Sequence, residues 1–331
     1  MPRKDNSAGL ILIMGLAILV ASCGGDDSST GSSGSYRAVN FADYDALITE
    51  IAPPQYSGPS ATPGDIDPDW NTGSNPLLGK VFSEDEPMSL YWNLAYFEDQ
   101  TSEIEQLLQV DDSTGEYLAG NMITVTTLTS PVTIPSAASG VLGTSVSVGT
   151  LIEADFEGMP AGTINQLAFN QDSTQETILS YFYYPSTDET ESSIFYATHN
   201  LADSSVTMKA VFVKLESDGS RHSWVYDIHS VNEDDFAYRM SWYAPDFGDT
   251  SGLGCIVGGG NRDTEFALRY RQYRPAESST YDSIYILDQV FTSSYGEGTS
   301  LLSSYSAFIS ESLIFGYSHH PQALLESPFG Q

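Results

Sequence analysis

The chain is poor in three features that would each define a class of protein: cysteine, basic residues and long apolar runs. Only two of its 331 residues are cysteine, which excludes a disulfide-stabilised scaffold. Lys and Arg total 12 against 44 Asp and Glu, and the formal charge of −32 argues against binding nucleic acid through its phosphates. The composition also excludes collagen, a coiled coil and a multi-span membrane protein.

Familiar catalytic and metal-binding motifs are missing as well. The five histidines form neither HExxH nor another close metal-binding spacing, and a Cys/His zinc site would need more thiols. No GxSxG motif is present for a serine nucleophile. The glycines of residues 252–258 are followed by a β-like run instead of a helix, so they do not form a dinucleotide-binding loop. The sequence therefore nominates no catalytic residue, and a non-enzymatic role is the favoured expectation.

The first 23 residues carry the strongest functional signal. A short basic start precedes an apolar run over residues 8–20, which is too short to cross about 30 Å of hydrocarbon and is typical of a secretory signal. The run ends in Val20-Ala21-Ser22-Cys23, which resembles the lipobox of bacterial lipoproteins. The resemblance covers only this segment. It implies that residues 1–22 are removed and that Cys23 becomes an acylated N-terminus that anchors the protein to a bilayer.

The segment after the lipobox is typical of a tether. Residues 23–35 comprise the lipidated cysteine and a Gly-, Ser- and Asp-rich stretch with a mean reach of about 20 Å. We therefore expect a lipid-anchored protein of the bacterial cell envelope, outside the cytoplasm. Gly24 rather than Asp follows the cysteine, which favours the outer membrane in a Gram-negative organism. Cys255 is then the only remaining thiol, and its apolar neighbours predict that it is buried.

Periodicity predicts one mainly β domain over residues 36–331. Residues 36–80 are rich in Pro, Gly, Asn and Asp and predict irregular structure, whereas residues 121–291 predict strands. Between them, apolar residues recur at three- and four-residue steps over residues 87–109, which predicts an amphipathic helix. Its opposite face is expected to be acidic and solvated, and carries Glu98, Asp99, Glu103 and Glu105.

The strand pattern becomes regular beyond residue 176. Eight β-rich runs, separated by short turn clusters, are centred near residues 181, 195, 210, 225, 239, 256, 269 and 286. Short loops join antiparallel neighbours, so we predict an antiparallel meander of about eight strands or more, open or barrel-like, packed on the helix. Alternation predicts an aromatic face that includes Trp224 and Tyr226, and a polar face that includes Asp227 and His229. This architecture is similar to that of bacterial lipoprotein carriers whose open half-barrels hold acyl chains, a similarity of fold alone.

Arginine is unevenly distributed. Four of the eight arginines fall within residues 262–274, and Arg239, Arg269 and Arg271 are expected to lie near one another on the polar face. Guanidinium groups bind carboxylates and phosphates through paired hydrogen bonds, so these three form the candidate site for a lipid headgroup or an acidic glycan. The competing interpretation is ion pairing with acidic neighbours: Asp227, Glu265 and Asp282.

Calcium is the only cofactor for which the sequence suggests a binding site. Asp65, Asp67 and Asp69 alternate as the ligands of an EF-hand loop do. However, Trp70 stands where that loop needs glycine, and Pro76 stands where it needs a bidentate glutamate. An irregular Ca²⁺ loop is one interpretation, and a solvated acidic surface that keeps the protein soluble is the other.

The leading hypothesis is a non-enzymatic envelope lipoprotein that binds an apolar or amphiphilic ligand between sheet and helix. Its expected partner is the lipid bilayer, reached through acylated Cys23. One alternative is a structural or adhesive surface protein that binds Ca²⁺ or a protein partner through its acidic exterior. A second is a glycan hydrolase with paired carboxylates, which would need a carboxyl of strongly raised pKa in a cleft.

Overall fold

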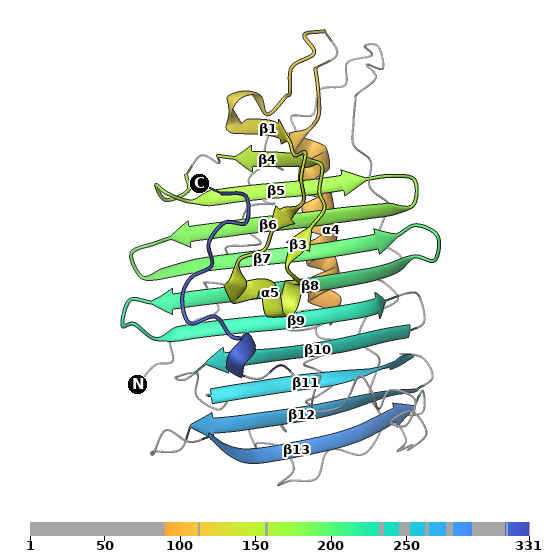
Figure 1. The fold of residues 1–331 in the computed structure, drawn as a ribbon, viewed down its shortest axis with the longest axis vertical. Coiled ribbons are helices and arrows are strands. Elements are labelled where there is room, and N and C mark those ends of the chain that lie inside the picture. Colours follow the sequence, from red (N-terminus) through yellow and green to blue (C-terminus); the bar gives the residue numbers. More distant parts are fainter. Residues whose placement is uncertain are drawn as a thin grey trace, which may run out of the picture.

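The computed structural model describes residues 90–111, 113–155, 158–231, 235–244, 252–261, 265–275, 281–292, 315 and 317–330. The fold is mainly β. One antiparallel sheet of eleven strands is accompanied by a two-stranded sheet, β2 (Val132–Thr133) with β3 (Ser145–Val146), and by helices α4 (Leu90–Leu107) and α5 (Ser136–Leu142) (Figure 1). None of the helices within the described ranges is long and apolar enough to cross a membrane.

The eleven strands follow one another in chain order, so the large sheet is a meander. Each strand pairs antiparallel with its neighbours. The strands are β1 (Ile123–Thr127), β4 (Thr150–Ala154), β5 (Ile164–Gln171), β6 (Gln175–Pro185), β7 (Glu189–Asn200), β8 (Ser205–Glu216), β9 (Arg221–Val231), β10 (Asp235–Ala244), β11 (Gly252–Asn261), β12 (Glu265–Pro275) and β13 (Tyr281–Thr292). The predicted meander is confirmed: each of the eight expected runs is one strand from β6 to β13, and β1, β4 and β5 extend the sheet.

Aspartates fix several of the hairpin turns, and with them the strand register. Asp172 Oδ1 accepts hydrogen bonds from the backbone N–H groups of Thr174 (2.7 Å) and Gln175 (2.8 Å) between β5 and β6. Asp218 accepts one from the N–H of Ser220 (2.8 Å) between β8 and β9. Asp side chains favour such turns because they satisfy backbone donors two or three residues ahead. The turn clusters in the sequence therefore mark the hairpins correctly.

Two different coverings lie on the two faces of the sheet (Figure 1). Helix α4 crosses one face, which we call the helix face, behind the strands in this view. On this face Ile178, Phe195 and Met208 are completely buried, and α4 contributes buried Ile104 and Leu107. The predicted helix over residues 87–109 is thus confirmed, with its described part ending at Leu107.

One detail of that helix prediction is wrong. Glu103 was expected on the solvated face of α4, but its Oε1 accepts a hydrogen bond from Asn165 Nδ2 of β5 (3.4 Å). A helix that lies flat on a broad sheet brings the borders of its apolar stripe into contact as well. Glu103 lies at such a border and therefore contacts the sheet at Asn165.

The opposite face, which we call the tail face, is covered by α5 and by residues 317–330. Helix α5 buries Ala138, Val141 and Leu142 against an apolar cluster that includes Val211 and Val225 of the sheet. The helix ends at Gly143, whose φ of +90° favours glycine, and whose N–H bonds Ser139 O. Sequence periodicity did not find α5, because seven residues give too few apolar repeats. Residues 301–317, whose apolar spacing suits either a helix or a strand, lie largely outside the described residues.

Candidate functional site

A row of charged residues crosses three adjacent strands on the tail face. Register places Lys209 of β8 opposite Asp227 of β9, and Asp227 opposite Arg239 of β10. Asp227 is completely buried. Its Oδ2 lies 2.5 Å from Arg239 Nη2 and 3.8 Å from Lys209 Nζ, and its Oδ1 lies 2.7 Å from His229 Nε2. The Asp227 carboxylate thus contacts two permanent cations and an imidazole.

These partners keep Asp227 ionised. Burial acts to raise the pKa of Asp227, but hydrogen bonding to His229 and the charges of His229 and Lys209, with the Arg239 hydrogen bond, outweigh burial and leave the pKa lowered. The guanidinium carbon of Arg239 lies 4.3 Å from the centroid of the Phe315 ring, so Arg239 also makes a cation–π contact. The pairing of Arg239 with Asp227 is the ion pair that the sequence offered as the competing interpretation.

Register extends this row to the other predicted arginines. Val257 of β11 lies between Arg239 and Arg269 of β12, and Arg269 lies opposite Asp288 of β13. In the neighbouring row, Arg271 of β12 lies opposite Cys255 of β11 in the strand register. The three candidate arginines therefore belong to two adjacent rows of one sheet, on strands separated by β11.

The C-terminal segment is fixed to the tail face beside this row. The His320 ring lies between two buried hydroxyls, with Nδ1 2.7 Å from Ser223 Oγ and Nε2 2.8 Å from Ser241 Oγ. Burial, together with the positive charge of Arg221, lowers the pKa of His320 to about 3. Arg221 also donates a hydrogen bond to Pro321 O. The imidazole is therefore neutral, donating through one nitrogen and accepting through the other.

Beyond His320 the segment runs across the strands toward β5, as the dark blue trace in Figure 1 shows. Ser192 Oγ accepts a hydrogen bond from Leu325 N (2.8 Å), and Tyr181 Oη donates one to Leu325 O (3.0 Å). Ser327 Oγ donates to Gln166 Oε1 (2.6 Å). Sequence reasoning missed this contact, because isolated polar residues on three strands do not reveal which distant segment they bind.

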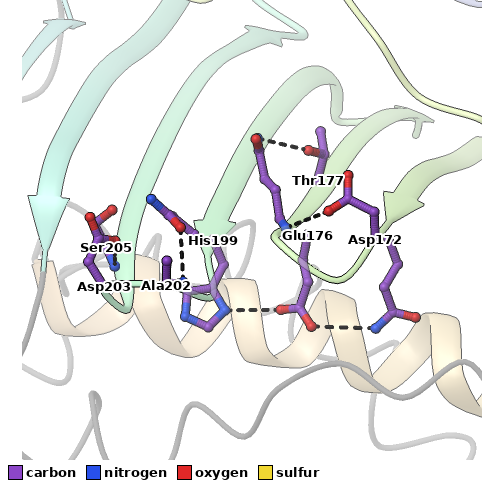
Figure 2. Close-up of polar contacts among 10 residues, drawn as sticks. Asp172, Glu176, Thr177, His199, Ala202, Asp203 and Ser205 are labelled. Carbon is purple, nitrogen blue, oxygen red and sulfur yellow. Dashed lines mark hydrogen bonds and ion pairs between the residues drawn. The ribbon is translucent and has the colours of Figure 1, made fainter.

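A second buried acid–base pair lies on the helix face. Glu176 of β6 and His199 of β7 are opposite in register, and Glu176 Oε2 lies 3.0 Å from His199 Nδ1 (Figure 2). The two side chains are 2% and 7% exposed. Gln171 Nε2 also donates to Glu176 Oε1, over 3.4 Å. The pair is a cross-strand contact whose members bind each other, which suits a structural role.

Two carboxyl groups have the raised pKa that the hydrolase hypothesis requires. Burial raises the pKa of Glu103 to about 7, although the Asn165 hydrogen bond opposes this. Burial, and then the charge of Glu189, raise the pKa of Glu191 to about 7. Lys214 Nζ lies 3.9 Å from Glu191 Oε1 and also pairs with Glu189. Each carboxyl is thus bound to a side chain of the protein itself.

Metal binding finds no support in the part of the chain that the structure describes. There, no three His, Cys, Asp or Glu side chains are grouped to hold a metal ion. The calcium candidates Asp65, Asp67 and Asp69 lie outside the described residues, as does the lipidation candidate Cys23.

Comparison with protein-family models, with curated proteins and with solved structures finds no match for this chain. The fold and the residues themselves therefore carry the functional argument.

Proposed function

We propose that this chain is a lipid-anchored protein of the bacterial envelope that acts by binding an anionic amphiphile. The lipobox Val20-Ala21-Ser22-Cys23 supports the anchor. The charged row of the tail face supports the ligand class. The observation that supports the ligand site is the strand register, which places Arg239 and Arg269 on either side of Val257.

Positive charge is concentrated where the site is proposed. No Lys or Arg occurs between Lys80 and Lys209, whereas eight of the 12 lie in the segment that begins with Lys209 and ends with Arg274. In so acidic a chain, a local group of cations attracts anions that the remaining surface repels. Arginine adds the paired hydrogen bonds that carboxylate and phosphate accept.

Apolar residues on β11 suit the other half of an amphiphile. Register places Leu253, Cys255 and Val257 between β10 and β12, the strands that carry the candidate arginines. Residues directly opposite in an antiparallel pair share a face. A ligand lying along β11 would therefore meet apolar residues, with arginine opposite Val257 on both neighbouring strands and opposite Cys255 on β12.

The space beneath α4 is less suitable than the sequence suggested. Ile178, Phe195 and Met208 on the helix face have no exposed surface, so their surroundings leave no room for a ligand or for water. We therefore place the ligand on the tail face, near the C-terminal strands, instead of between sheet and helix.

Native mass spectrometry of the mature, detergent-purified protein tests the binding site. We expect a co-purified anionic amphiphile, with occupancy at least tenfold lower in the double variant Arg269→Gln/Arg271→Gln. Arg274→Gln removes one positive charge from the same strand, opposite Asp282, and should retain the ligand. Equal occupancy in the double variant would refute the site.

Metabolic labelling with a clickable fatty acid tests the anchor separately. We expect the wild-type protein to be labelled and membrane-bound, and Cys23→Ala to be neither. An unlabelled wild-type protein, or a Cys23→Ala variant that still sediments with membranes, would contradict the anchor and leave the ligand site standing.

A further inference from the structure

Strand β1 is one edge of the large sheet, and its backbone has a definite outward side. The bonds Leu128 N–Gly149 O (2.9 Å) and Asp155 N–Met122 O (2.8 Å) flank its pairing with β4. Hydrogen-bonded pairs alternate along an antiparallel ladder, so even-numbered residues of this strand bond to β4. The N–H and C=O groups of Ile123, Val125 and Thr127 therefore point away from the sheet.

Within its described residues, strand β1 lacks three devices that often prevent strand addition: charge, proline and a bulge. Its sequence, Ile-Thr-Val-Thr-Thr, contains no charge and no proline, and its register with β4 has no bulge. Thr124, Thr126 and Thr127 are exposed. β-Branched residues of this kind also favour strand pairing.

Exposed apolar side chains accompany the edge. The described residues include four large hydrophobic side chains that are exposed, and three of them precede β1 within six residues: Tyr117 (39%), Leu118 (55%) and Met122 (47%). Single exposed apolar residues are ordinary, but a group beside an unprotected edge indicates a contact surface.

The negative charge around this edge favours a basic partner. Three exposed acids lie around the edge: Glu116 precedes β1, Glu153 lies on its partner strand β4, and Asp155 directly follows β4. No Lys or Arg lies between Lys80 and Lys209. A second copy of this chain, paired edge to edge, would bring the same carboxylates together and be repelled. A strand that carries Lys or Arg would instead meet only opposite charge.

We propose that β1 accepts an extended basic segment of another protein, which adds to the sheet as a twelfth strand. Main-chain hydrogen bonds to Ile123, Val125 and Thr127 would supply affinity, and the acidic surroundings would supply selectivity. This surface is independent of the arginine row and of the anchor.

The test uses the full mature protein and a fluorescent nonapeptide of alternating lysine and valine. The control peptide has the same sequence with alternate backbone nitrogens methylated, so that it keeps the charge and loses the pairing edge. We expect saturable binding of the first peptide, and at least tenfold weaker binding of the second. Equal binding of both peptides would reduce the contact to charge alone and overturn the proposal.

Variants of β1 locate the binding edge. Val125→Pro removes an outward N–H and spares the bonds to β4, so it should weaken peptide binding at least tenfold, whereas Val125→Ala should change it less than threefold. Thr127→Pro, at an exposed position, gives the same test should Val125→Pro fail to fold. Wild-type affinity in the folded proline variant, or a dimer in sedimentation that these variants abolish, would refute a basic partner at this edge.

Discussion

Two carboxyl groups on opposite faces of the sheet, one partly buried and one completely buried, have pKa values shifted in opposite directions. Glu103 on the helix face has its pKa raised to about 7, whereas the pKa of Asp227 on the tail face is lowered. Burial acts in the same direction on both. The partners differ: Glu103 accepts hydrogen bonds from the amides of Asn165 and Gln100, each over 3.4 Å, whereas Asp227 has Lys209, Arg239 and His229.

The contrast follows from where the cations lie in the chain. Glu103 and its amide partners fall within the stretch between Lys80 and Lys209, which contains no Lys or Arg, so only neutral donors are near in sequence. Neutral amides stabilise a carboxylate less than a charged partner does. The pKa of Glu191 is also raised to about 7, because burial, Glu189 and Glu216 raise it more than Lys214 lowers it. Lys209, Arg239 and His229 together outweigh burial at Asp227, whereas Lys214 alone does not at Glu191.

The largest effect is expected for Asp227→Asn. It would leave Lys209 and Arg239 without their buried counter-ion, and we expect a loss of about 3–5 kcal/mol at pH 7 in urea denaturation. The native pKa of Asp227 is depressed, so its stabilisation is present above the unfolded value of 3.8 and disappears as pH falls through the native value. The variant should therefore lose stability less steeply than wild type below pH 4. Asp218→Asn, in an exposed turn, is the control. A loss of stability below 1 kcal/mol for Asp227→Asn would contradict the contrast between Asp227 and Glu103.

Much of the fold could be predicted because meander strands are local in sequence. Short connections, most of them of three or four residues between β5 and β13, place consecutive runs side by side, so the spacing of apolar runs determines strand order. Register follows from the same turns, and the pair Glu176–His199 could have been derived from the turn at Pro185. Contacts with covering segments were not predictable in this way: His320 meets Ser223 across 97 residues with no intervening pattern.

The site was predictable only in part. Alternation correctly placed Asp227, His229 and Arg239 on one face, because side-chain direction in a strand depends on parity alone. It did not reveal that Asp227 is buried, since burial depends on what covers the face. Phe315 and the C-terminal segment supply that cover, and neither is near the strands in sequence.

A smaller effect of opposite sign is expected for Glu103→Gln. The pKa of Glu103 is raised from 4.5 to about 7, so the native protein holds a proton that the unfolded chain has lost, and stability falls as pH rises through this window. Replacing the carboxyl by an amide should therefore stabilise the protein by about 1–3 kcal/mol at pH 8.5 and have little effect below pH 4.5. Glu105→Gln on the same helix is the control, because it measures the change in stability that comes from removing one negative charge from α4. A gain that is independent of pH would show that ionisation of Glu103 is not its source.

Lys209→Met gives the smallest change and tests whether the number of cations sets the contrast. Methionine keeps the apolar stem, and Arg239 and His229 still hold Asp227, so we expect a loss of about 1 kcal/mol and a pKa of Asp227 closer to its ordinary value, followed by NMR titration. In the Asp227→Asn background, Lys209 would face Arg239 without a carboxylate between them, and the same substitution should become neutral or stabilising. Equal losses in both backgrounds would mean that Lys209 acts through packing of its stem, and that Arg239 and His229 suffice to keep the buried carboxylate charged.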